Sequence, residues 1–326
     1  MLIQPLDADR PGHLHAGFHQ AYLAAHAHVP GPKLTRPHFV IEVTEGPPGG
    51  TAEAWVVTEG DEVTAGYAMS FPEDDNSHMA WLFPLVVRPE RRGAGLGSAL
   101  FEHALGRVRA RGRRLLLTET PSTGVGARFA RAHGMDVALE QARRVLDLRT
   151  ADWAALDRLM PEDKGYDLEH WTGPARPELH RDLATLMNGM NDAPRDADVE
   201  DAVYTPERIR AAEENLARIG ETCHTTIARR RDDGAPAGLT RIYLRADRSD
   251  AWGNQGDTTV LPGHRGHRLG LLLKLANLRS LREHEPHIEQ IITWNAVSNR
   301  HMIAINEAMG FTVLDHWPEW RLDVTP

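Results

Sequence analysis

A duplicated segment constrains the fold of this chain more than any other feature of its sequence. The stretch Val87–Gly97 reads VRPERRGAGLG, and Val260–Gly270, which begins 173 residues later, reads VLPGHRGHRLG. Both copies fit the pattern V-x-P-x-x-R-G-x-x-L-G and lead into a segment with helical periodicity. A second match, with an offset of 176 residues, places Gly134 against Gly310. A repeat of roughly 150 residues is too long for a solenoid, so we expect two similar domains.

Each copy predicts a strand, a tight glycine-containing loop and a helix. In the second copy, Thr258–Val260 is a β-type run, a Pro-Gly pair interrupts it, and Leu269–Leu281 has helical periodicity. A helix that begins in such a loop leaves backbone N–H groups without partners, and these groups bind anions, above all phosphate. Arg265 and Arg268 add positive charge. A solvated helix entry that binds nothing is the alternative, and the duplication favours the phosphate site.

Composition excludes several classes of protein. The chain has 326 residues, of which 41% are hydrophobic and 25% charged, as expected for two globular domains. A net charge of −9 argues against general nucleic-acid binding. The N-terminus lacks a secretory pattern, and no apolar run is long enough for a membrane span. The single cysteine, Cys223, cannot form an intrachain disulfide; we expect a packed structural thiol and a cytoplasmic location.

The 18 histidines do not form a recognisable metal-binding motif. Several of them gather between His13 and His28, but no carboxylate or cysteine completes a ligand set at metal spacing. We therefore expect no metal.

The remaining pattern predicts the same succession of elements in each half. The expected domains are 1–150 and 166–326, joined by a linker at 151–165 that carries a small helix and a polar break at Pro161–Gly165. The segment Phe39–Val43 fits either a strand or a short helix. The expected helices are Pro11–His28, Gly97–Arg111, Gly124–Ala132, Asp152–Leu159, Pro177–Asn188, Pro206–Ile219, Leu269–Leu281 and Asn299–Met309, and the expected strands are Ala54–Thr58, Val63–Phe71, Trp81–Val87, Arg114–Thr118, Met135–Leu148, Cys223–Arg229, Gly238–Arg245, Asp257–Leu261, Gln290–Trp294 and Phe311–Val324.

These features resemble the GNAT superfamily of acyl-CoA N-acyltransferases, in the tandem form found in actinobacteria. The first loop matches the family's R/Q-x-x-G-x-G/A pyrophosphate motif, and Asn299 with the following helix resembles its N-x-x-A-I-x-L-Y-x-x-x-G-F motif. The resemblance covers nearly the whole chain as two units. It implies acyl-CoA, and acetyl-CoA in particular, as cosubstrate. The residues that it assigns to the coenzyme are Val87, Arg92, Gly93, Gly95 and Gly97 in the first unit, and Thr259, Val260, Leu261, Arg265, Gly266, His267, Arg268, Leu269, Gly270 and Asn299 in the second.

The resemblance also implies the fold class, which is mixed α/β. Each unit should have a central mixed sheet of six or seven strands with helices on both faces. Two neighbouring strands of that sheet should splay apart, so that Leu82–Val87 and Asp257–Leu261 offer free backbone groups to the pantetheine arm.

Acyl transfer to an amine needs an oriented neutral amine, an oxyanion donor and proton transfer. In the family, a tyrosine four residues before the helix-end glycine often protonates the leaving thiolate. Ala130 and Asn306 hold these positions here, so the usual acid is absent from both units. Because Asp257 stands where the family often places a base, and Asn295 and Asn306 accompany it, we expect the second unit to be catalytic, with these three residues in the site. Asp257 could alternatively be a cross-strand or edge charge.

Three further features bear on the second unit. Arg268 replaces the middle glycine of the loop, which is tolerable if the residue avoids positive φ and points outward, where it could meet the 3′-phosphate of the coenzyme. The stretch Asn191–Asp201 is rich in carboxylates and is either an acidic wall that attracts a cationic amine or a solvated flexible loop. Among Trp252, Trp294, Trp317 and Trp320, we expect most to be core and one to line a pocket.

The sequence and the resemblance thus predict an N-acyltransferase (EC 2.3.1) that moves an acyl group, acetyl by the resemblance, from acyl-CoA to a primary amine of a small molecule or peptide. The alternative is a non-catalytic acyl-CoA-binding or sensory module, motivated by the missing tyrosine; it would bind acetyl-CoA without turnover. Because two fused units can replace a homodimer, a monomer is expected.

Overall fold

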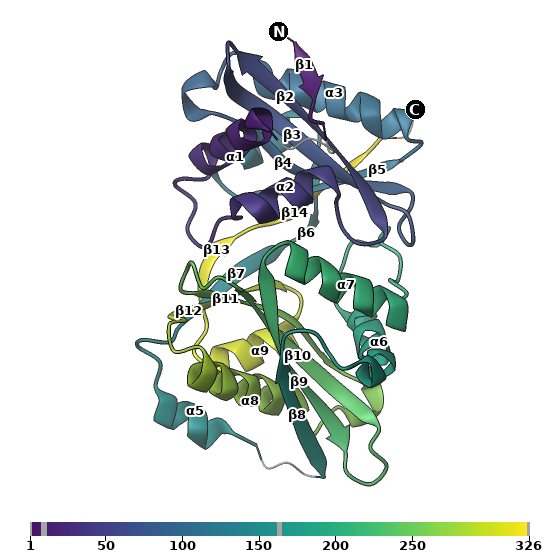
Figure 1. Ribbon diagram of the computed structural model, residues 1–326, viewed down its shortest axis with the longest axis vertical. Helices are drawn as coiled ribbons and strands as arrows, with labels where there is room; N and C mark the ends of the chain where they lie inside the picture. Colours follow the sequence, from purple (N-terminus) through teal and green to yellow (C-terminus); the bar gives the residue numbers. More distant parts are fainter. Residues whose placement is uncertain (1, 8–11, 162–164, 325–326) are drawn as a thin grey trace. The chain divides into compact units, whose positions relative to one another are not determined.

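The computed structural model describes residues 2–7, 12–161 and 165–324. The chain forms two compact units (Figure 1). The first comprises Met1–Leu139, Asp198–Glu200 and Trp317–Pro326, and the second comprises Glu140–Ala197 and Asp201–His316. Of the sequence expectations, the helix start at Pro11 and most of the polar break at 161–165 lie outside the described residues.

Both units are built on a seven-stranded mixed sheet, as the sequence predicted. The first sheet has the order β1-β2-β3-β4-β5-β14-β6, and the second has the order β8-β9-β10-β11-β12-β7-β13 when read from the corresponding edge. In each sheet the central pair, β4 with β5 or β11 with β12, is parallel and the other pairs are antiparallel. The strands are β1 (Ile3–Pro5), β2 (Gly50–Glu59), β3 (Glu62–Pro72), β4 (Met79–Val87), β5 (Leu115–Glu119), β6 (Asp136–Leu139), β7 (Gln141–Asp147), β8 (Tyr166–Thr172), β9 (Glu221–Arg230), β10 (Pro236–Arg245), β11 (Trp252–Val260), β12 (Gln290–Ala296), β13 (Thr312–His316) and β14 (Glu319–Asp323).

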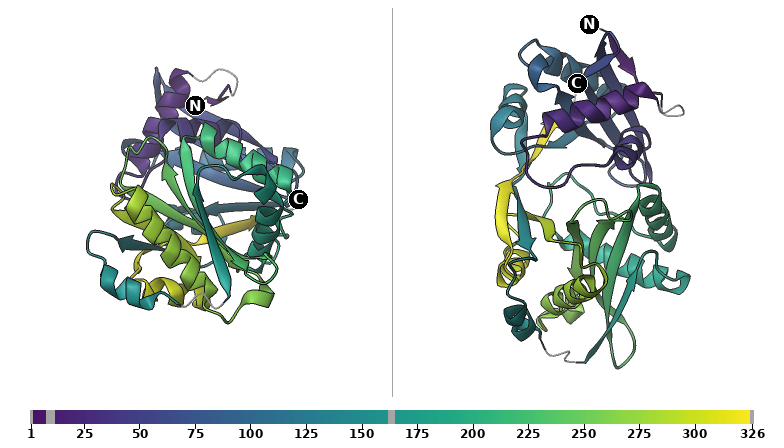
Figure 2. Two further views of the ribbon diagram at one scale, coloured as in Figure 1. Left: turned by 60° about the horizontal axis from the view of Figure 1, so that its bottom comes forward. Right: turned by 60° about the vertical axis from the view of Figure 1, so that its left-hand side comes forward.

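Helices cover both faces of each sheet because each sheet is apolar on both sides. In the first unit, α1 and α2 pack over a cluster that contains Val56 and Val63, while α3 and α4 pack over one that contains Tyr67 and Leu116. In the second unit, α8 packs against β9 and β10, and α6 and α7 also contact those strands (Figure 2). The helices are α1 (His13–Ala25), α2 (Arg36–Thr44), α3 (Leu96–Ala110), α4 (Gly124–Ala132), α5 (Trp153–Leu159), α6 (His180–Asn188), α7 (Pro206–Arg218), α8 (Leu269–His284) and α9 (Arg300–Ala308).

The last strand of each half lies in the sheet of the other unit. Strand β7 follows β6 in the chain, yet it pairs with β12 and β13 of the second sheet. Strand β14 ends the chain and pairs with β5 and β6 of the first sheet. The compact units therefore depart from the contiguous ranges 1–150 and 166–326, because each unit takes one strand from the far half of the sequence.

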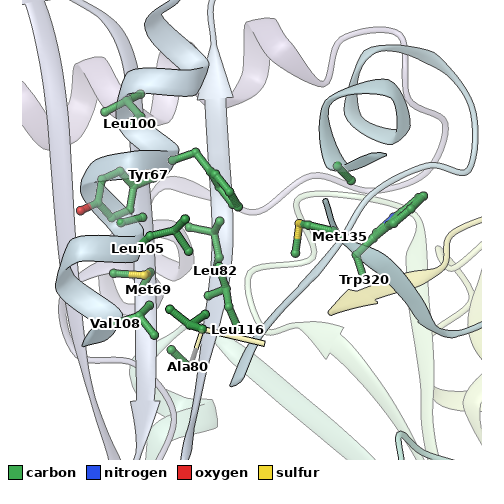
Figure 3. Close-up of a cluster of buried hydrophobic side chains, with 14 of the residues drawn as sticks. Tyr67, Met69, Ala80, Leu82, Leu100, Leu105, Val108, Leu116, Met135 and Trp320 are labelled. Carbon is green, nitrogen blue, oxygen red and sulfur yellow. The ribbon is translucent and has the colours of Figure 1, made fainter. Parts of the chain in front are cut away.

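The exchanged strand β14 completes the core of the first unit. Trp320 lies 1% exposed beside Met135, and both belong to the cluster that α3 covers (Figure 3). Tyr67, Leu100 and Leu116 fill the centre of that cluster. Burial of a large aromatic side chain contributes about 1.5–3 kcal/mol, so the terminal strand is a substantial part of this core.

The central parallel strands of both sheets separate after a short paired segment. In the first unit, the Thr118 hydroxyl donates to the Leu82 carbonyl over 2.7 Å at the point of separation. In the second, the Thr293 hydroxyl donates to the Gln255 carbonyl over 2.9 Å. The parallel pairing covers only Met79–Trp81 with Leu115–Leu117, and Trp252–Asn254 with Gln290–Ile292. The splayed strands implied by the family resemblance are therefore present in both units.

Candidate active site

The loop after β4 has the backbone of an anion-binding helix entry. A short 3-10 turn, Pro89–Arg91, leads to Gly93 and Gly95, which have φ angles of 83° and 80°. Gly95 is the N-cap of α3. A β-carbon at Gly95 would meet no atom within 4 Å, so glycine is favoured there by conformation and not by space. The four N–H groups that open α3 lack intrahelical acceptors and are suited to phosphate.

A cavity of about 480 Å³ lies beside this loop. The ends of α1 and β4, the loop, the start of α3 and the helix α4 line it. Its volume falls in the usual range of about 300–1,000 Å³ for cofactor sites. The five residues predicted for the coenzyme in the first unit all line this cavity: Val87, Arg92, Gly93, Gly95 and Gly97.

Arg92 gives the cavity its positive charge. Its guanidinium donates to the carbonyl oxygens of Val87 (3.3 Å) and Ala25 (3.4 Å), and among the described residues it has no carboxylate partner. Neighbouring Arg91 is paired with Glu59. The Arg92 charge is therefore available to an anionic ligand.

His26, at the C-terminal end of α1, lines the same cavity. Its Nδ1 lies 2.9 Å from the carbonyl oxygen of Tyr22. A carbonyl oxygen can only accept, so Nδ1 carries the proton and Nε2 has a free lone pair. Burial lowers the pKa of His26 below its usual value, although the bond to Tyr22 opposes this effect. The imidazole is therefore neutral near pH 7 and able to take a proton.

The backbone of the second loop repeats the geometry of the first, with one residue in an energetically unfavourable conformation. The 3-10 turn Pro262–His264 and Gly266, with a φ of 83°, match their counterparts. Arginine at position 268 was judged tolerable if it avoided positive φ, and this condition is not met: Arg268 is the N-cap of α8 with a φ of 56°. The offset of the repeat places it where the first loop has Gly95, so the backbone keeps the left-handed turn although the side chain opposes it by about 1–2 kcal/mol.

Arg265, the counterpart of Arg92, is neutralised in this structure. Its Nε donates to the Val260 carbonyl over 2.9 Å, and its Nη2 lies 2.5 Å from Oδ2 of Asp192. The acidic stretch 191–201 is thus not an unpaired acidic wall, although Asp192 remains 55% exposed. Other carboxylates of the stretch are also paired, Asp198 with Arg321 and Asp201 with Arg195.

Asp257, the predicted base, lies at an irregularity of β11. It accepts a 2.7 Å hydrogen bond from the Tyr243 hydroxyl, and its carboxylate is 3.8 Å from the guanidinium of buried Arg241. The pKa of Tyr243 is raised well above its usual value, chiefly by burial and then by the Asp257 charge. Asp257 therefore makes the cross-strand contacts that were the alternative to a role as catalytic base, although its side chain remains 26% exposed.

The structure brings together two of the three predicted catalytic residues. Asn306 donates a 2.7 Å hydrogen bond to Asn295, and both are buried, whereas Asp257 contacts Tyr243 and Arg241. Asn299 caps α9 by accepting from the Met302 amide over 3.2 Å, which is a structural use of that side chain. The other predicted positions follow β11 into α8: Thr259 and Val260 end the strand, Leu261 and His267 lie in the loop, and Leu269 and Gly270 open the helix.

Sequence reasoning missed the walls of the first cavity that come from α1 and α4. His26 and His28 were weighed only as metal ligands, and Thr120, Gly126 and Phe129 were not singled out. The duplication could have pointed to α4 as part of the site, because α4 is the counterpart of the Asn299 helix that the resemblance assigned to the coenzyme.

Three general properties of the described residues complete the picture. In the part of the chain that the structure describes, no three His, Cys, Asp or Glu side chains are arranged to hold a metal ion. No helix within those residues is long and apolar enough to cross a bilayer. Cys223 is buried, and burial raises the pKa of its thiol to about 11, which suits an unreactive core position.

Two splayed mixed sheets, each with a glycine loop before a helix, define a tandem acyltransferase fold of the GNAT type. The acetyltransferase (GNAT) family model matches residues 25–135. The mycothiol acetyltransferase of Nocardioides sp. is 27% identical over 245 residues, covering 71% of this chain and 76% of that protein.

Solved structures support the tandem arrangement. A tandem GNAT protein from the clavulanic acid biosynthesis pathway, determined without acetyl-CoA, is 29% identical, with a TM-score of 0.82 over 100% of this chain and 99% of that one. A GCN5-related N-acetyltransferase from Sphaerobacter thermophilus has a TM-score of 0.68 at 15% identity, covering 100% and 96% of the two chains, and it shows the fold alone. These similarities support acyl transfer as the activity.

Proposed function

We propose that this protein transfers an acyl group from acyl-CoA to a primary amine of a small molecule or peptide, and that the first unit holds the coenzyme. The observation that carries the proposal is the cavity of about 480 Å³ that joins the glycine loop to the splayed edge of β4. The second unit was expected to be catalytic, but its loop arginine is paired with Asp192. That pairing favours the first unit as the working one.

The residues of the first unit have separate roles in this proposal. The amides at the start of α3 and the Arg92 guanidinium bind the diphosphate of the coenzyme. The backbone groups of Leu85–Val87, which have no β5 partner, pair with the pantetheine arm. The bound coenzyme supplies the activated thioester. Orientation of the amine beside that thioester supplies much of the rate enhancement.

His26 is the proton acceptor in this scheme. The attacking amine must lose a proton, and the free Nε2 of a neutral imidazole can receive it directly or through a water molecule. The thiolate leaving group needs no strong acid, since thiols have a pKa near 8.5. This is consistent with Ala130 at the place where the family often has tyrosine.

A matched pair of variants tests which unit works. Gly97→Glu and Gly270→Glu introduce the same negative charge at the second residue of α3 and of α8. We expect Gly97→Glu to abolish acyl-CoA binding and amine-dependent release of CoA, and Gly270→Glu to retain both. The reverse result would assign catalysis to the second unit and to Asp257, Asn295 and Asn306.

The second candidate function is an acyl-CoA-binding or sensory module without turnover. The absence of a tyrosine acid from both units favours it. Acetyl-CoA would then raise the melting temperature while no amine in a broad panel releases CoA. Turnover with any amine excludes it.

A further inference from the structure

A smaller cavity of about 90 Å³ adjoins the coenzyme cavity of the first unit. Leu85, Thr120 and Phe129 line both cavities, so the two are neighbours. Leu82 and Thr118, whose hydrogen bond marks the separation of β4 and β5, line the smaller one. In the proposed function, this is the place that the thioester end of the coenzyme reaches.

The walls of this cavity are mainly apolar and contain no cation at neutral pH. Phe101, Ala130, Met135 and Trp317 are each at most 6% exposed and form its apolar lining. The ionisable lining residues are His26, which is neutral because burial lowers its pKa, and Glu119, which is acidic. A carboxylate on the acyl group would find no countercharge here, and burying it would be unfavourable.

The second unit has polar side chains at the corresponding positions. By the offsets of the repeat, Lys274 stands for Phe101 and Asn306 for Ala130. Lys274 is 1% exposed, and Asn306 is fully buried and bonded to Asn295. The apolar character of the smaller cavity therefore depends on the side chains of the first unit and does not follow from the fold that the two units share.

We infer that the first unit accepts a neutral apolar acyl group longer than acetyl, of three or four carbons, and that Phe101 and Ala130 limit its length. The inference rests on the proposed function of this unit. A volume of about 90 Å³ takes about three water-sized groups, which matches the hydrocarbon part of a propionyl or butyryl group. Acetyl fits as well but leaves part of the hollow empty, and each additional buried methylene should tighten binding ~4-fold.

The test is calorimetric titration of the full chain with CoA, acetyl-CoA, propionyl-CoA, butyryl-CoA and succinyl-CoA. We expect affinity to rise from acetyl to butyryl and succinyl-CoA to bind more weakly than butyryl-CoA. Ala130→Phe places a ring in the hollow and should remove the gain for longer chains while retaining CoA binding. Arg128→Phe adds the same ring to an exposed position of α4 and should leave the chain-length order unchanged.

The outcomes separate this inference from the function on which it rests. If acetyl-CoA binds most tightly, or if succinyl-CoA binds as well as butyryl-CoA, the acyl-group inference is wrong although the function survives. If CoA and all acyl-CoAs fail to bind, the proposed function is wrong and the inference is overturned with it. Should Ala130→Phe fail to fold, the wild-type series still decides, and Ala130→Leu gives a smaller obstruction.

Discussion

The Arg265 guanidinium lies 2.5 Å from the Asp192 carboxylate, whereas Arg92, at the corresponding place, donates to the backbone carbonyls of Val87 and Ala25. One loop arginine is thus paired with a carboxylate, and the other retains its charge for a ligand. The pair is half exposed on both sides, so it contributes at most about 1 kcal/mol to stability. Its effect on an anionic ligand is larger, because a carboxylate beside the loop repels phosphate.

Asp192→Asn should therefore give the second loop some affinity for CoA. We expect the calorimetric stoichiometry to rise above one CoA per chain, with little change in the melting temperature. Asp201→Asn removes the ion pair between Asp201 and Arg195 instead and serves as the control. An unchanged stoichiometry in Asp192→Asn would mean that other features, such as Arg268, close the second loop.

The left-handed N-cap positions predict opposite effects of substitution in the two loops. Gly95→Ala should lower the free energy of unfolding by about 1 kcal/mol, because alanine is disfavoured at a φ of 80° and meets no steric obstacle there. Arg268→Gly should raise it by up to about 1 kcal/mol, since glycine relieves the same strain. Urea unfolding curves measure both. If both substitutions changed the free energy of unfolding in the same direction and by the same amount, that result would contradict the left-handed φ angles at Gly95 and Arg268.

The repeated pattern predicted both loops and most helices, because these depend on local residue order, whereas the splayed strands were implied by the family resemblance. The segment Phe39–Val43, which fitted strand or helix, lies in α2, where the Thr35 side chain accepts from the amide of His38. The short edge strand β1 and strand β8 were not predicted; their residues have no clear two-residue alternation in the sequence.

The exchange of β7 and β14 could not be read from the sequence for a physical reason. The two strands are copies of one element, with Leu146-Asp147 matching Leu322-Asp323. The sequence of either strand is therefore compatible with the corresponding position in either sheet. Only the tertiary structure decides which sheet receives which strand. The ion pair between Asp192 and Arg265 joins residues far apart in sequence, so it also could be known only from the tertiary structure.

Lys274 predicts an unusual pH dependence of stability. Burial lowers its pKa from 10.5 to about 7, and its Nζ lies 5.4 Å from the centre of the Phe311 ring. The unfolded chain therefore binds more protons than the folded chain between about pH 7 and 10.5, so stability rises with pH across that window. Below pH 7 both states are protonated, and the full cost of burying the charge remains, of the order of 4 kcal/mol.

Lys274→Met should raise the free energy of unfolding by several kcal/mol at pH 6 and by much less at pH 10. Chemical denaturation at several pH values measures the difference. Arg279→Met removes an exposed charge from the same helix and should change stability by about 1 kcal/mol or less at either pH. A stabilisation by Lys274→Met that is the same at pH 6 and pH 10 would show that the lysine does not titrate in this range.

His26→Gln tests the proton acceptor of the first unit. Glutamine keeps a side chain of similar reach but cannot take a proton, so we expect kcat to fall about 10²–10⁴-fold while acyl-CoA affinity changes little. In the wild-type protein, kcat/KM should decline on the acid side at a pH below 6.5, because burial lowers the pKa of His26 and protonation removes the lone pair on Nε2. His26→Gln should lose this acid limb. His28→Gln, which alters another histidine at the same cavity, should retain it. A variant that keeps both its rate and its acid limb would remove His26 from the mechanism and leave the base to be sought elsewhere.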